Sequence, residues 1–400
     1  MRKVWRRQKT NWKTVVIRQV FNRFFDQMTM QYSNIYIREL GASPIELGEV
    51  NSASGITSAL ISLPLGILQD RYSVRKIFLF GIALLTLVPL IYALSNSWEF
   101  TALAILLTGL GNRLGSCVVI CDLSLPNEDR ATGKALCEGL GAIPSLIAPT
   151  VAAFIITWIG GINVRSIRLL FWMQLVARIV LFLYVVVRLT EIDRPPRKES
   201  GLNFMEEMRD LLSRGVAVRR WLLYISISMF TGTMMMTFLY PYVYEVKGAN
   251  QFIIGGVATL ITLSEALFSI PLGRTADKVG RKKVLYILIP LFSLANFLLI
   301  LIPTPIYLLP IAVLLGFRMI AGYIAGSMTP ELVPKDCIGR WRGIIGLSTG
   351  LITIPAPIIG GILWERLGPG YILMTIAIID LLLRMILLKS MPETLHLKHS

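Results

Sequence analysis

Apolar residues occur in long runs separated by short polar segments, and this pattern covers most of the chain. A helix rises about 1.5 Å per residue, so about 20 apolar residues cross a hydrocarbon layer about 30 Å thick. We place twelve such runs, at 14–37, 45–68, 77–95, 99–121, 138–160, 168–189, 221–245, 252–272, 284–302, 305–328, 343–365 and 370–388. The pattern therefore predicts an all-α integral membrane protein with twelve transmembrane helices, arranged as two pseudo-symmetric six-helix bundles.

A polar, basic segment recurs at the corresponding place in each half of the chain. Residues 66–76, GILQDRYSVRK, follow the second run, and residues 273–283, GRTADKVGRKK, follow the eighth. Both have a glycine, an aspartate four residues later and a basic pair near the end. The recurrence in register with the runs indicates an internal repeat, and the excess of Lys and Arg indicates cytoplasmic loops.

The runs divide the chain into five segments, with both termini expected in the cytoplasm. These are a basic N-terminus, a first bundle, a linker, a second bundle and a tail, at 1–13, 14–189, 190–220, 221–390 and 391–400. In the linker, Asn203 precedes Glu206 in a capping-box arrangement, and apolar residues follow on one helical face. We predict a short amphipathic helix on the cytoplasmic membrane surface, with a flexible tether as the alternative.

Composition supports a membrane protein and excludes several other classes. With 54% hydrophobic and 16% charged residues, the chain is too apolar for a soluble globular protein. The net charge of +16 does not indicate nucleic acid, because most of the 40 Lys and Arg fall in predicted cytoplasmic segments, where anionic lipid is the expected partner. The four cysteines predict neither a disulfide framework nor a metal site, and no cofactor is expected. We expect a monomer in the plasma membrane.

The first predicted span is unusually polar for a membrane helix. Aromatic and apolar side chains occupy one arc of it, and polar ones, including Asn22, Arg23 and Asp26, occupy the rest. Such a helix is stable in a membrane only beside water or a polar cavity. Asp26 lies near mid-depth with Arg23 one turn away, and two interpretations stay open: a structural Asp26–Arg23 pair, or a role of Asp26 in binding a proton or the substrate.

Two arginines form a matched pair in the fourth and tenth spans. Arg113 and Arg318 both stand among glycines, which let neighbouring helix backbones approach closely. A guanidinium buried there needs a carboxylate, a carbonyl or a substrate anion. The seventh span adds Thr231, Met234 and Met235, and such adaptable side chains suit the lining of a tolerant cavity.

Other spans carry further charged residues, each a candidate for substrate or proton binding because a charge at the bilayer centre costs roughly 3 kcal/mol. Arg178 in the sixth span has no obvious partner nearby in the sequence. Glu265 in the eighth span lies on one polar stripe with a threonine and a serine. Asp380 and Arg384 in the twelfth span are one turn apart, so we expect them to bind each other.

Twelve spans in two repeats, with a G-x-L-x-D-R-x-x-x-R-K loop after the second span, resemble the major facilitator superfamily. The first loop matches this signature through Gly66, Leu68, Asp70, Arg71, Arg75 and Lys76. The second copy matches through Gly273, Ala276, Asp277, Lys278, Gly280, Arg281 and Lys282. The P-x-x-G-G sequence at 357–361 and Pro-Glu-Thr at 392–394 are further similarities, so the resemblance extends over nearly the whole chain.

The resemblance implies alternating access, in which two bundles rock about a central site lined by the first, fourth, seventh and tenth spans. It also implies that the two basic loops act as gates. Asp70 would face the start of the eleventh span near Arg340 and Arg342, and Asp277 would face the start of the fifth span near Gly139.

The expected function is secondary active transport of a small organic solute. The first hypothesis is proton-coupled efflux of amphipathic compounds, with H+ as the coupling ion and Asp26 as the coupling group. The alternatives are a nutrient or organic-anion symporter of the same fold, or a membrane sensor that does not transport. An enzyme is disfavoured, because the two histidines lie at the C-terminal end and the sequence has no nucleophile elbow or phosphate-binding glycine loop.

Overall fold

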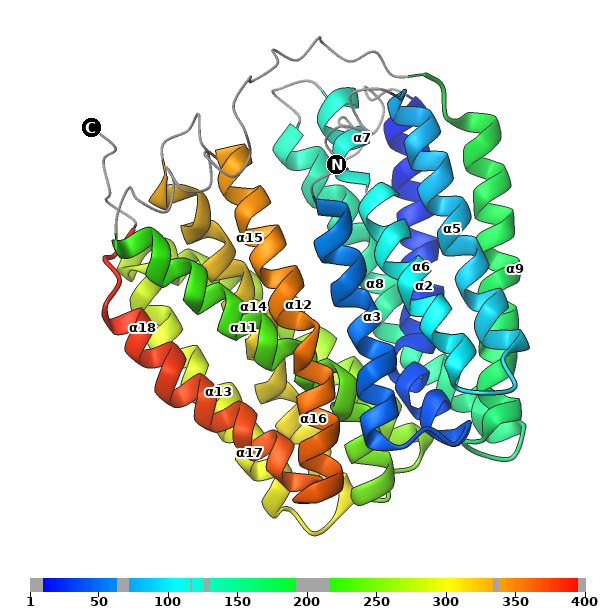
Figure 1. Cartoon of the computed structure of the whole chain (residues 1–400). Helices are drawn as coiled ribbons and strands as arrows, with labels where there is room; N and C mark the ends of the chain where they lie inside the picture. The colour runs from blue at the N-terminus through cyan, green and yellow to red at the C-terminus, as the bar shows by residue number, and fades with distance from the viewer. Residues whose placement is uncertain are drawn as a thin grey trace. The chain divides into compact units, whose positions relative to one another are not determined.

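The computed structural model describes residues 10–62, 72–115, 117–125, 130–191, 216–333 and 338–394 (Figure 1). All regular secondary structure in these residues is helical. The chain forms two compact units, one of Met1–Ala42 with Leu60–Lys198 and the other of Ser43–Ala59 with Glu199–Ser400. Each unit is described below by itself.

The helices of the first unit coincide with predicted spans. They are α2 (Thr10–Glu39), α5 (Val74–Leu94), α6 (Glu99–Leu114), α7 (Cys117–Ser124), α8 (Arg130–Trp158) and α9 (Val164–Arg188). The described residues of the fourth predicted span lie in α6 and α7, with α6 ending at Leu114 and Gly115 as its C-cap. At the start of α9, Asn163 and Ser166 form a capping box, which satisfies backbone donors that the helix itself leaves unpaired.

The second unit holds the remaining helices. They are α11 (Val216–Pro241), α12 (Gln251–Val279), α13 (Arg281–Leu301), α14 (Leu308–Met328), α15 (Ile338–Thr353), α16 (Pro355–Arg366), α17 (Gly370–Ile379) and α18 (Met385–Lys389), with shorter turns η1 (Tyr242–Val246), η2 (Pro305–Tyr307), η3 (Thr329–Leu332) and η5 (Asp380–Arg384). The last predicted span consists of α17, the π-helical turn η5 and α18.

Helix α3 (Pro44–Ser62) begins within the second unit. The hydroxyl of Ser52 donates a hydrogen bond of 2.5 Å to the carbonyl oxygen of Ile354, which precedes α16. The sequence repeat instead assigns this span to the first bundle, 14–189. That division into sequence repeats, with a second bundle at 221–390, stays a prediction.

Nine helical stretches among the described residues are long and apolar enough to cross a membrane. They include α5, α9, α12 and α13, and their exposed surfaces carry large apolar side chains such as Phe80 and Leu301. Helix α2 is not among the nine, in agreement with the polar character expected of the first span. The chain is therefore a multi-pass, all-α membrane protein, as predicted.

Glycines bring helices α5 and α6 into close contact. A Cβ atom at Gly81 would lie 2.2 Å from the backbone nitrogen of Gly115, and one at Gly111 would lie 2.6 Å from Cγ of Leu85. Real Cβ atoms cannot approach backbone or side-chain atoms so closely, so glycine is required at both positions. The glycines around Arg113 thus have the packing effect that the sequence predicts.

The second basic segment, 273–283, differs from the expected loop. Helix α12 continues through Val279 and α13 begins at Arg281, so Gly280 alone separates the two helices, with a φ of 116°. The sequence places the end of the span where the apolar run ends. The helix itself continues through the charged residues that follow, because Arg and Lys are good helix formers. The helix ends where glycine adopts a backbone conformation that other residues avoid. The linker helix expected around 203–212 lies outside the described residues.

Candidate functional site

The first cluster of polar side chains surrounds Asp26 of α2. One carboxylate oxygen, Oδ1, lies 2.6 Å from Nη2 of Arg178 and accepts a hydrogen bond of 2.8 Å from Nε2 of Gln174. The other, Oδ2, accepts a hydrogen bond of 2.5 Å from Nδ2 of Asn22. Three donors therefore hold the Asp26 side chain in place on α2. The Asp26 side chain is still 39% exposed, whereas Arg178 is 9% exposed.

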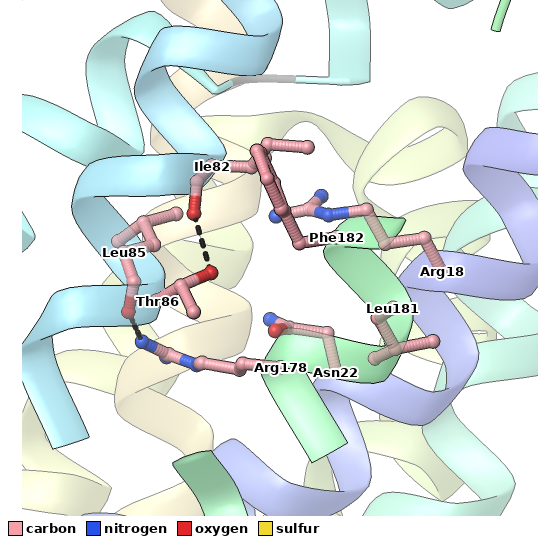
Figure 2. Close-up of a pocket in the computed structure, with 8 residues that line it drawn as sticks. All are labelled: Arg18, Asn22, Ile82, Leu85, Thr86, Arg178, Leu181 and Phe182. Atoms are coloured by element: carbon pink, nitrogen blue, oxygen red, sulfur yellow. Dashed lines mark hydrogen bonds between the residues drawn. The ribbon is translucent and has the colours of Figure 1, made fainter. Parts of the chain in front are cut away.

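A second contact fixes the guanidinium of Arg178. Its Nη1 atom donates to the carbonyl oxygen of Leu85 on α5 (Figure 2). Arg178 thus bridges α2 and α5 from its position on α9. The guanidinium therefore has one attachment to α2 and another to α5.

A small pocket adjoins this cluster. Its lining includes Arg18, Asn22 and Arg178 together with apolar and hydroxyl side chains of α5 and α9 (Figure 2). The guanidinium carbon of buried Arg18 lies 5.3 Å from the ring centre of Phe78. The pocket has room for about one water molecule, so it can hydrate the charged groups but cannot hold an organic solute.

The ion pair of Asp26 differs from the local pair considered from the sequence. Asp26 binds Arg178, whereas the Arg23 side chain runs along Gly141 of α8, where a Cβ atom would lie 2.6 Å from Cδ of Arg23. The structure therefore supplies the partner that the sequence does not offer for Arg178. It leaves the role of Asp26 in proton or substrate binding as a prediction.

A second cluster, in the other unit, is centred on Asp380 of η5. Nη1 of Arg318 lies 2.8 Å from Oδ2, and Nη1 of Arg384 lies 2.9 Å from Oδ1. The hydroxyl of Thr231 donates a further hydrogen bond of 3.0 Å to Oδ1. Asp380 is completely buried, so two guanidiniums surround one carboxylate away from water. The expected contact between Asp380 and Arg384 is present, and Arg318 joins it.

The two arginines of this cluster are also bound elsewhere. Nη2 of Arg318 donates to the carbonyl oxygen of Ser228 at 2.8 Å and to the Thr231 hydroxyl at 2.7 Å. Nη2 of Arg384 donates to the hydroxyl of Tyr224 at 3.1 Å. Both guanidiniums lie over the ring of Phe292, at 5.3 and 5.5 Å from its centre. These contacts spread the excess positive charge over dipoles and a ring face.

The other predicted candidates have different surroundings. Arg113 is exposed near the end of α6, and its side chain has no ion pair with the described residues, whereas the Arg318 side chain is 13% exposed and pairs with Asp380. Met234 and Met235 are buried within the second unit, and their place in a cavity lining stays a prediction. Glu265 of α12 accepts a hydrogen bond of 2.5 Å from the hydroxyl of Tyr323 on α14.

The residues of the second predicted gate form a network within their own unit. Arg281 lies 3.4 Å from Asp277, donates to the carbonyl oxygen of Ser327 at 3.2 Å and forms an ion pair with Glu331. Gly273 borders open space on α12. The gating contact expected between Asp277 and the fifth span would join the two units, and it stays a prediction.

The Pro-Glu-Thr sequence contributes to the same network. The carboxylate of Glu393 accepts hydrogen bonds from the backbone nitrogens of Arg281 and Lys282, at 3.2 and 3.1 Å. It therefore caps the first turn of α13, where backbone donors lack partners within the helix. In the first predicted gate, Arg75 donates to the carbonyl oxygen of Val186 at 3.1 Å, while Gly66, Asp70 and Arg71 lie outside the described residues.

Sequence reasoning missed several residues of the two clusters. Gln174 and Arg178 stand one turn apart on α9, and two polar positions at that spacing in an apolar run are a signal that could have identified Gln174. Tyr224 and Phe292 have no such signal, because aromatic residues are common in membrane helices. Only the fold reveals their contacts with the arginines.

Comparisons with known proteins agree with this architecture. The family model described as Major Facilitator Superfamily matches residues 17–261 and 230–398. The chain is 26% identical over 317 residues to Multidrug resistance protein MdtG of Enterobacter lignolyticus, covering 76% of this chain and 72% of that protein. It is 23% identical over 364 residues to an uncharacterised MFS-type transporter of Methanocaldococcus jannaschii, covering 86% of each.

A solved structure has the same fold. The crystal structure of a variant of the nucleoside transporter NupG superposes with a TM-score of 0.77, covering 94% of this chain and 99% of that chain. The two sequences are 16% identical. The similarity therefore concerns the arrangement of helices and not the compound that is transported.

Proposed function

The chain belongs to the major facilitator superfamily and is a secondary transporter rather than an enzyme, and from this premise we propose that it exports amphipathic organic compounds in exchange for protons. The name of the relatives called multidrug resistance proteins supports export of such compounds. The proposal places the protein in the plasma membrane with both termini in the cytoplasm.

The observation that carries the proposal is the environment of Asp26. Its carboxylate is partly exposed, forms an ion pair with Arg178 and accepts hydrogen bonds from the amides of Gln174 and Asn22. Protonation removes the charge that attracts Arg178, and the guanidinium then keeps its contact with Leu85. Proton binding would therefore loosen α2 from α9 while α9 stays attached to α5. A change of contacts between helices is what coupling to transport requires.

The rest of the unit supports a proton role for this group. The water-sized pocket beside Arg18, Asn22 and Arg178 provides a place for a water molecule to exchange protons with the cluster. Asp380 is a poorer candidate, because two guanidiniums stabilise its charge and no part of it is exposed. Asp26 is thus the better coupling group of the two.

One observation favours a second function, symport of an organic anion. The exposed guanidinium of Arg113 on α6 is open to a carboxylate or phosphate of a solute. Arg318 is less suited to this role, because Asp380, Ser228 and Thr231 already bind it. Comparing cationic, neutral and anionic solutes in one assay separates the two functions.

The test uses purified protein in liposomes. A panel of amphipathic compounds is first screened for thermal stabilisation, and each stabilising compound is then added to liposomes with an imposed pH gradient. We expect the compound to dissipate the gradient only when the protein is present. Counterflow without a pH change would contradict proton coupling, and stabilisation without either would indicate a sensor.

A further inference from the structure

Glu265 lies inside the membrane-spanning part of α12. Within the predicted apolar run 252–272 it stands thirteen residues from the start and seven from the end, about 20 and 10 Å along the helix. Lipid head groups gather at the membrane surface, so they lie too far away to bind this carboxylate. Its charge can be compensated by a bound proton, by a group of the protein or by a cationic solute inside the transporter.

The protein compensates Asp26 and Asp380 but not Glu265. Asp26 has Arg178 as its partner, and Asp380 has two guanidiniums. Among the described residues, the Tyr323 hydroxyl is the group that donates to Glu265, and no cationic side chain forms an ion pair with it. A single neutral hydrogen bond leaves most of the acceptor capacity of a half-buried carboxylate unused.

Neighbouring helix positions offer no substitute. The nearest charged residue on α12 is Arg274, more than two turns away, and the one charged residue on α14 is Arg318. Arg318 is held by Asp380 at 2.8 Å. The charge of Glu265 is therefore available to a ligand.

Aromatic rings and open space lie next to this carboxylate. The Tyr323 side chain is 58% exposed, and Phe268, one turn beyond Glu265, is 39% exposed. The Phe268 ring lies 5.5 Å from that of Phe317, at 56°. Beside Tyr323, Cβ atoms at Gly322 and Gly326 would meet nothing within 4 Å, so the surface of α14 is open there.

We infer that Glu265, with the rings of Tyr323 and Phe268, binds the positively charged group of an amphipathic organic cation. The carboxylate attracts the charge, and ring faces stabilise a quaternary or protonated ammonium group. The apolar body of the compound lies along the paired rings of Phe268 and Phe317. The inference rests on the proposed function, because it names the class of exported compound, and it adds a site on α12 and α14.

Binding of two probes of equal shape and opposite charge tests the inference. Tetraphenylphosphonium and tetraphenylborate are each titrated into purified protein without any gradient. We expect Glu265→Gln to weaken binding of the phosphonium at least tenfold and to leave or strengthen binding of the borate. The exposed Glu365→Gln serves as the matched control and should bind both probes as the wild type does. Equal loss of both probes, or no loss, in Glu265→Gln would overturn the inference.

A measurement on the wild-type protein covers the case in which Glu265→Gln does not fold. A hydrophobic carbodiimide modifies carboxyl groups within the membrane, and mass spectrometry of peptides locates the product. We expect the phosphonium, but not the borate, to protect Glu265 from modification. Unprotected Glu265 at saturating phosphonium would contradict the site. Both measurements are made without a gradient, so they can fail while proton-coupled export stands, and they can succeed while it fails.

Discussion

The guanidinium of Arg178 lies 2.6 Å from the carboxylate of Asp26, although 152 residues separate them in the sequence. The contact joins α2 and α9, the first and last described helices of the first unit. Because Arg178 also binds Leu85 of α5, one side chain links three helices. One of the two attachments of this arginine is therefore the carboxylate of Asp26.

Replacement of Arg178 should destabilise the protein moderately. Arg178→Ala removes a buried guanidinium and its contacts with Asp26 and Leu85. Since Asp26 is partly exposed and keeps two amide donors, we expect a loss of about 1–3 kcal/mol in the free energy of unfolding. Thermal unfolding in detergent measures it, with exposed Arg188→Ala as the control. Equal melting temperatures of the two variants would contradict the bridging role.

Replacement of Asp380 should be more severe. Asp380→Asn leaves Arg318 and Arg384 buried without a counter-charge, which costs about 3–5 kcal/mol. We expect a large fall in melting temperature or a failure to fold. Adding Arg384→Met to Asp380→Asn should recover part of the loss, because it removes one uncompensated charge. If Asp380→Asn unfolds at the wild-type temperature, the cluster is not a structural element.

The two charge clusters show which contacts can be predicted from the sequence and which cannot. Asp380 and Arg384 are one helical turn apart, so periodicity alone predicts their contact. Arg178 and Asp26 lie on different helices, and no periodic pattern connects them. The similar settings of Arg113 and Arg318 in the sequence also conceal a difference, because the Arg318 side chain is only 13% exposed and pairs with Asp380, whereas Arg113 is exposed.

The positions of helices were more predictable than their ends. The described residues of each predicted span are largely helical, since hydrocarbon thickness sets the length of an apolar run. The end of α12 at Val279 was not predicted, because helix propensity continues past the last apolar residue. Glycines in a membrane helix predict close contact with a neighbouring helix, as at Gly81 and Gly111. The residues that they contact cannot be predicted in this way, because they depend on how the helices pack.

Close packing of α5 and α6 gives a third prediction. Gly81→Ala places a methyl group 2.2 Å from the backbone of Gly115, so the helices must separate. We expect a loss of about 1–3 kcal/mol, measured by thermal unfolding. Gly273→Ala is the matched control, because a Cβ atom there meets nothing within 4 Å. The control should be as stable as the wild type or slightly more so, and equal behaviour of the two variants would contradict the close contact.

The cap of α13 gives a fourth prediction. Glu393→Gln removes the negative charge that accepts from the backbone nitrogens of Arg281 and Lys282. Such a charge at a helix N-terminus contributes about 0.3–1 kcal/mol. We expect a small fall in melting temperature that high salt reduces. Exposed Glu365→Gln controls for the loss of a carboxylate, and a fall independent of salt would argue against an electrostatic cap.

The most direct test of proton-coupled export is the behaviour of Asp26→Asn in liposomes. An asparagine keeps the size of the side chain but cannot exchange a proton, so the variant should still exchange labelled solute across the membrane at equal concentrations. It should fail to accumulate solute against its gradient when a pH gradient is imposed, whereas the wild type accumulates it. Wild-type accumulation by Asp26→Asn under the same pH gradient would contradict the account.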